Sequence, residues 1–193
     1  MDSNQADLLQ QRNAELEKDL AVKDRALQIE AALEKVRART MEMHRSSELA
    51  EAATLLFGQL SQLGASIWIC GFCICQKDNQ VVEKWVSPPD GKMMDPVYIP
   101  YTIDEFERHA YEAWKTGLEI YSDIVEGTEL QESHEQLLEH PSMQKAKNYL
   151  IENNIPMPTW VQRYAVTYKH GYLMVVTLKQ FEETHILVRF ARV

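Results

Sequence analysis

The chain contains neither glycine nor proline before Gly58, although seven of each occur in its 193 residues. Both residue types interrupt helices, and the first 45 residues are instead rich in Ala, Leu, Glu, Gln, Lys and Arg, which favour them. This stretch therefore has none of the usual turn residues, and the sequence predicts a single long helix over residues 1–45.

Long apolar runs are also missing. No uninterrupted run approaches the ~18–20 residues that a membrane-spanning helix needs, and residues 1–20 are polar and acidic rather than typical of a signal peptide. We therefore expect a cytoplasmic protein without direct membrane contact.

Basic residues are absent between Lys115 and Lys145, where seven acidic residues fall. They contribute to a net charge of -9. An acidic surface repels phosphate backbones, which argues against nucleic-acid binding.

Cysteine is scarce, and the motifs of common enzymes are missing. Cys70, Cys73 and Cys75 lie in an apolar stretch typical of a strand, where Cys73 and Cys75 would face one side and Cys70 the other. Buried thiols are thus favoured over a zinc or redox site. His134 is interpreted as a solvated helix residue, and the histidine spacing indicates no metal site. We predict no catalytic residue and no enzyme, and the sequence identifies no cofactor.

The long helix carries two apolar patterns that are one residue out of phase. One is formed by Leu9, Leu16, Leu20 and Leu27, with Asn13 at a polar position of the same seam. The other, which follows the a/d spacing of a coiled coil, is formed by Val22, Ala26, Ile29, Leu33, Val36 and Met43. We predict a homodimer through Leu9, Leu16, Leu20, Ile29, Leu33, Val36 and Met43. The alternative is a helix that packs on its own domain.

The remaining residues, 46–193, have the pattern of one α+β domain. Ser46 and Ser47 could cap a second helix over 48–63. Thr102 and Glu105 have capping-box spacing for a third helix, which ends at Gly117. Residues 128–153 are predicted to be helical with a break near Pro141. Strands are predicted at 65–75, 81–86, 97–101, 160–168 and 172–178, with an undecided stretch at 118–125 and a last helix at 182–193. We predict an antiparallel sheet with the terminal helices on one face and the inserted helices on the other.

Three segments carry a resemblance to a known family. The run Glu30–His44, which continues through Ser47–Glu51, and the runs Trp68–Phe72 and Val188–Val193 resemble GAF-like sensor domains of bacterial signalling proteins, including those associated with histidine kinases in two-component systems. The resemblance implies a dimeric regulatory input domain with a pocket between sheet and inserted helices. It names no ligand, since the family binds very different small molecules or none.

Aromatic residues are the best indication of a ligand site. Trp68 and Phe72 are expected to share one strand face that looks toward the inserted helices, with Arg163 available for an anionic group. The predicted ligand-binding residues are Trp68, Phe72, Trp85, Tyr98, Trp114, Trp160 and Tyr164. Alternatively, these rings fill a core, and the domain is a ligand-free dimerisation and signal-relay module.

Overall fold

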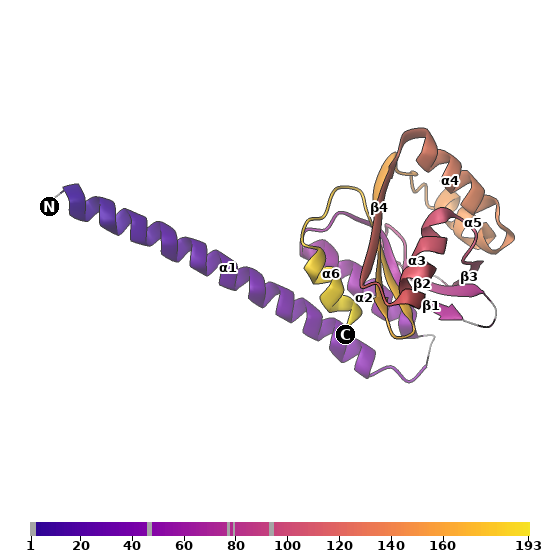
Figure 1. Cartoon of the computed structure of the whole chain (residues 1–193), viewed down its shortest axis with the longest axis horizontal. Coiled ribbons are helices and arrows are strands. Elements are labelled where there is room, and N and C mark those ends of the chain that lie inside the picture. Colours follow the sequence, from indigo (N-terminus) through magenta and orange to yellow (C-terminus); the bar gives the residue numbers. More distant parts are fainter. Residues whose placement is uncertain (1–2, 46–47, 77, 79, 93–94) are drawn as a thin grey trace.

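A computed structural model of the chain describes residues 3–45, 48–76, 78, 80–92 and 95–193 (Figure 1). Ser46 and Ser47, the predicted cap of the second helix, lie outside these residues. The helices are α1 (Ser3–Met41), α2 (Leu49–Gln62), α3 (Glu105–Thr116), α4 (Gly127–Glu139), the 3-10 turn η2 (Pro141–Met143), α5 (Gln144–Glu152) and α6 (Thr184–Ala191). The strands are β1 (Ile67–Gln76), β2 (Val81–Ser87), β3 (Val97–Pro100), β4 (Ile120–Glu126), β5 (Trp160–Tyr168) and β6 (Gly171–Thr177).

The six strands form one antiparallel sheet in the order β3-β2-β1-β6-β5-β4. The undecided stretch at 118–125 is its edge strand β4. The central pair, β1 and β6, joins two hairpin-like halves that are far apart in the sequence. The predicted α+β class, with an antiparallel sheet covered by helices on both faces, is confirmed.

The first face of the sheet is covered by the C-terminal half of α1 together with α2 and α6 (Figure 1). Ile29, Leu33 and Val36 of α1 are almost completely buried there, in a core with Leu173 and Val175 of β6. These three seam residues of the sequence-based prediction therefore pack against their own domain, as the alternative proposed. Met43 lies beyond the end of α1. The end of α1 is thus part of the 46–193 domain's core rather than a separate unit.

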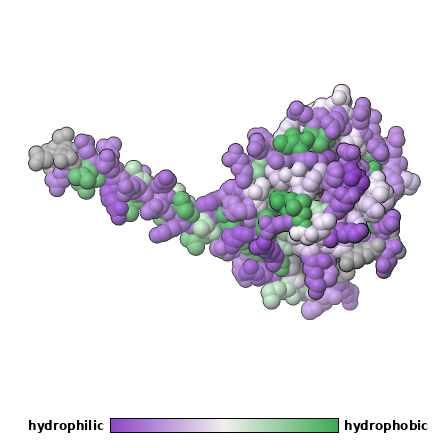
Figure 2. Space-filling view, in the orientation of Figure 1, coloured by the Kyte–Doolittle hydropathy of each residue, from purple (hydrophilic) through white to green (hydrophobic). Residues whose placement is uncertain are grey.

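The other half of α1 projects away from the domain (Figure 1). Leu9, Leu16, Leu20 and Leu27 are 50–66% exposed, and Figure 2 shows apolar side chains spaced along the projection. At 100° per residue, these leucines and the buried residues 29–36 lie on opposite sides of the helix, about 170° apart. The two apolar patterns that looked like competing registers are two different faces.

The second face of the sheet is covered by the inserted helices α3, α4 and α5. Asp104 caps α3, because its side chain accepts a hydrogen bond from the Glu107 backbone N–H, and Gly117 ends the helix in the left-handed conformation. The capping residue is therefore Asp104 rather than Thr102. The break near Pro141 is confirmed, since α4 ends at Glu139 and η2 begins at the proline.

Within the part of the chain that the structure describes, no helix is both long and apolar enough to cross a membrane.

Candidate functional site

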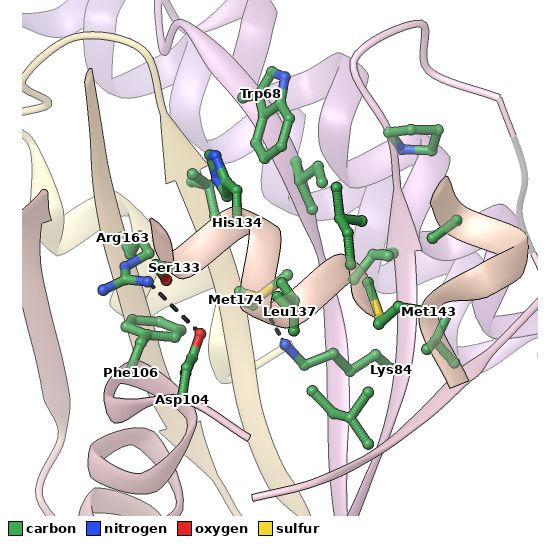
Figure 3. A pocket seen from close by; sticks show the side chains of 18 of the residues that line it. Trp68, Lys84, Asp104, Phe106, Ser133, His134, Leu137, Met143, Arg163 and Met174 are labelled. Carbon is green, nitrogen blue, oxygen red and sulfur yellow. Dashed lines mark hydrogen bonds and ion pairs between the residues drawn. The ribbon is translucent and has the colours of Figure 1, made fainter. Parts of the chain in front are cut away.

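A cavity of about 120 Å³ lies between the second face of the sheet and the inserted helices (Figure 3). Strands β1, β2, β3, β5 and β6 supply its floor, and α4, η2 and α5 cover it. Most of the lining is aliphatic, aromatic or thioether, including Val97, Ile99, Leu137, Met143 and Met174. A mainly apolar cavity with a few polar groups is the usual form of a small-molecule site.

Trp68 enters the cavity because of an irregularity in β1. The register of β1 against β6 shifts between Ile67 and Ile69, so that an extra residue lies between two ladder pairs, as in a β-bulge. Beyond the shift the alternation of side chains is reversed. Trp68 therefore faces the inserted helices, while Phe72 packs with the first-face core. The expectation that Trp68 and Phe72 share a face is corrected.

His134 of α4 packs against Trp68, with ring centroids 5.5 Å apart (Figure 3). Burial, followed by the nearby charge of Arg163, lowers the pKa of His134 to about 4. The imidazole is therefore neutral at pH 7. The interpretation of His134 as a solvated helix residue is corrected, because the side chain is part of the cavity wall.

Lys84 of β2 brings a positive charge to the wall beneath the inserted helices. Its Nζ pairs with Glu107 of α3, whose other carboxylate oxygen accepts a hydrogen bond from the Tyr172 hydroxyl. Lys84 Nζ also lies 3.4 Å from the sulfur of Met174 (Figure 3). Burial acts to lower the pKa of Lys84, but the facing Glu107 reverses the effect and the pKa is raised. Lys84 remains charged.

Arg163 of β5 supplies a second cation at the edge of the cavity. Its guanidinium donates two hydrogen bonds to Asp123, at 2.8 and 2.6 Å, and lies 3.9 Å from Asp104. It also lies 4.7 Å above the ring of Phe106. Such a bidentate pair fixes the guanidinium in place. The charge of Arg163 is matched by two carboxylates before any ligand arrives.

The three cysteines lie on the predicted faces, with Cys70 in the first-face core and Cys73 and Cys75 in the second. Burial raises the pKa of Cys70 and Cys73 far above the usual range, and that of Cys75 to about 12. Thiols in this state are poor nucleophiles and poor metal ligands. Among the described residues, no group of three or more His, Cys, Asp or Glu side chains is arranged to hold a metal ion.

Of the seven aromatic residues predicted for the ligand site, the structure places Trp68 at the cavity and the other six elsewhere. Tyr164 is buried in the first-face core, where its hydroxyl donates to the Phe181 carbonyl. Trp85 and Tyr98 both donate hydrogen bonds to Glu83, away from the cavity. Trp114 lies against Tyr111 on α3, and Trp160 opens β5 opposite Glu126.

Sequence reasoning missed the polar part of the wall, formed by Lys84, Glu107 and Asp104. One indication was present in β2, where Lys84 stands between Val82 and Val86 on the same side of an otherwise apolar alternation. A lysine in such a position requires a partner if the strand is covered. Its partner, Glu107, is 23 residues away and one of several acidic residues on α3, so the sequence alone does not identify it.

The helices that cover the cavity bury fewer of their side chains than the strands that form its floor. Leu130 is the buried residue of α4 and Ala146 that of α5, whereas every residue of β6 is buried. Elements with few buried apolar side chains open at lower free energy than the core. A ligand would enter beneath α4 and α5 rather than through the sheet.

Comparison of the chain with protein-family models, curated proteins and solved structures gave no match.

Proposed function

We propose that the chain is a cytoplasmic regulatory input domain of a bacterial signal-transduction protein, GAF-like in kind, that binds a small molecule in the cavity and relays its presence through α1. The observation that carries this proposal is the arrangement of one sheet between two unlike layers. A cavity with a thinly packed cover lies on one face, and the root of a long projecting helix lies on the other.

The central strands connect the two layers directly. On β6, Tyr172 and Met174 face the cavity side, whereas Leu173 and Val175 pack with α1 and α2 on the other side. Because interiors are close-packed, a ligand that displaces Met174 shifts the backbone that positions Leu173. The end of α1 lies on that layer, so a small movement there becomes a larger one at the far end of a helix about 58 Å long.

The projecting half of α1 is suited to a second copy of the chain. Its leucine stripe follows the spacing of a coiled-coil seam, in which Asn13 and Lys23 take the two remaining positions. A buried asparagine is best satisfied by the same residue of a parallel, in-register partner. We therefore propose a parallel homodimer through Leu9, Leu16, Leu20 and Leu27, with Ile29, Leu33 and Val36 left to the domain core.

The same stripe would also serve a relay module that binds no ligand, which is the alternative function. Native mass spectrometry of the purified chain, compared with its denatured mass, tests both. A dimer with extra mass that denaturation releases supports the sensor and provides its ligand for identification. A dimer of bare protein that no small molecule stabilises favours the relay module. A bare monomer at micromolar concentration contradicts the proposed dimer.

The paired variants Leu16→Asp and Leu20→Asp sharpen this test. Both side chains are about half exposed, so we expect the domain to remain folded while the dimer dissociates. Lys18→Asp, on the same helix but outside the stripe, is the control and should keep the dimer mass. Retention of the dimer by both leucine variants would show that another surface joins the copies.

A further inference from the structure

The cavity's charges suggest which kind of molecule it takes. We infer that it takes a small, neutral aromatic molecule with one oxygen acceptor, whose oxygen receives a hydrogen bond from the Lys84 ammonium. This inference rests on the proposed ligand-binding function and adds the chemical class of the ligand. It depends on the size of the cavity, the character of its walls, the balance of its charges and its unused hydrogen-bond donors.

Size limits the ligand to about one ring. A cavity of about 150 Å³ lined by apolar side chains is known to hold benzene, and the present one measures about 120 Å³. Methionine side chains adapt to their contents more readily than branched ones. A single ring with a small substituent therefore fits only when these side chains adapt, whereas a nucleotide or a tetrapyrrole would require the inserted helices to move apart.

The walls favour an aromatic ring over an aliphatic one. Figure 3 shows Trp68 at one end of the cavity, with Met143 and Met174 along its wall. Met157 also lines it, so that three of the eight methionines in the chain belong to the lining. Thioether sulfur makes favourable contacts with aromatic ring edges, worth about 0.3–1.5 kcal/mol each. A flat π-system in the cavity would offer its edges to thioethers and its face to the indole of this wall.

The charge balance favours a neutral ligand. Lys84 is paired with Glu107, and Arg163 with Asp123 and Asp104, so that every cation at the wall already faces a carboxylate. A carboxylate ligand would approach Glu107 and Asp104 without a free cation to receive it. A cationic ligand would meet Lys84 and Arg163. Either ion would be desolvated without compensation, which is costly in an apolar cavity.

The unused donors select an oxygen acceptor. An ammonium group carries three N–H donors, and among the described residues Lys84 Nζ has two partners, Glu107 and the weak acceptor Met174. The indole N–H of Trp68 is buried and has no hydrogen-bond partner within the described part of the chain. An oxygen placed near Lys84 would satisfy the remaining ammonium donor.

Four single-ring probes test the inference on the full chain: phenol, toluene, benzoate and benzylammonium. Isothermal titration should show phenol binding about tenfold more tightly than toluene, the approximate value of one hydrogen bond to a charged group. Both ions should bind more weakly than toluene. The Trp68 indole N–H resonance, assigned by its loss in Trp68→Phe, should shift with phenol.

The double variant Lys84→Met/Glu107→Gln removes the ammonium donor without leaving an unpaired charge, and the amide oxygen it introduces on α3 can still accept a hydrogen bond from Tyr172. We expect its phenol affinity to fall to the toluene value, whereas the exposed control Lys92→Met should bind as the unaltered chain does. Should the double variant fail to fold, the rank order of the four probe affinities on the unaltered chain still tests the inferred ligand class.

Equal affinities for phenol and toluene would overturn the role of Lys84 while leaving a ligand-binding cavity. Tighter binding of benzoate or benzylammonium would overturn the neutral class in the same way. If none of the four binds at millimolar concentration, the inference fails, and mass spectrometry of the purified chain decides separately whether the cavity binds any other molecule.

Discussion

The two faces of the sheet differ in what fills the space between sheet and helices. On the first face, aliphatic and aromatic side chains from α1, α2 and α6 form a core of buried residues. On the second, a cavity remains beside a buried ion pair. A close-packed core contributes stability and rigidity, whereas a cavity and a buried charge pair lower stability in exchange for a site. The contrast suggests that the first face holds the domain together and the second face responds.

The largest expected effect is a difference in stability between the same substitution at two leucines of α1. Leu33→Asp places a carboxylate in the first-face core, where Leu33 is 2% exposed. We therefore expect the free energy of unfolding to fall by at least about 4 kcal/mol, so that the domain no longer folds. Leu20→Asp, on the projecting part, should leave the free energy of unfolding of the domain within about 0.5 kcal/mol of its original value. Circular dichroism during urea titration measures both. A folded Leu33→Asp domain that has merely become monomeric would show that the packing of α1 on the sheet is wrong.

The second expected effect concerns the charge pair of the second face. Lys84→Met leaves Glu107 buried without its cation, and we expect a loss of about 3 kcal/mol in the free energy of unfolding. The double variant Lys84→Met/Glu107→Gln should recover most of that loss, because no unpaired charge remains. Urea titration of the double variant and of both single variants gives the coupling between the sites. Additive effects of the two substitutions would contradict a direct pair.

These expectations also show how much of the molecule could be predicted from its sequence. Most helix and strand positions, the α+β class and the distribution of helices over two faces were predicted, because hydrophobic periodicity and the turn residues act locally. The edge strand β4 was undecided from the sequence. The position of Phe72 was not, since a single-residue irregularity at Ile67–Ile69 reverses the alternation beyond it. No glycine or proline marks that irregularity.

The polar wall of the cavity was missed for a different reason. Lys84 meets Glu107, and Glu107 meets Tyr172, only once strands β2 and β6 and helix α3 are in place. Pairing across such distances leaves no periodic trace in a single sequence. Similarly, the two patterns on α1 were visible, but which of them packs on the domain depends on how the chain passes from α1 to α2. Local features were therefore predictable, and the convergence of distant residues was not.

A third comparison uses neighbouring residues of β6 that face opposite sides. Leu173→Ala removes a fully buried side chain from the first-face core, and we expect it to lower the free energy of unfolding by about 3–4 kcal/mol. Met174→Ala enlarges a cavity that already exists, so we expect about 2 kcal/mol. Urea titration at pH 7 distinguishes these values. Equal losses would indicate that both faces are packed to the same degree.

The last expected effect is the pH dependence that His134 imposes on the second face. Because the folded-state pKa of His134 is lowered to about 4 from an ordinary value near 6.5, the unfolded chain binds a proton that the folded chain does not between these pH values. Stability should therefore decrease as pH falls from about 6.5 to 4. His134→Gln should remove this part of the pH dependence, while the exposed control His185→Gln should retain it. Urea titrations at pH 7, 6, 5 and 4.5 measure the three slopes. Identical slopes for the His134 variant and the unaltered chain would place His134 in water rather than against Trp68, and the cover of the cavity would then be more open than the structure has it.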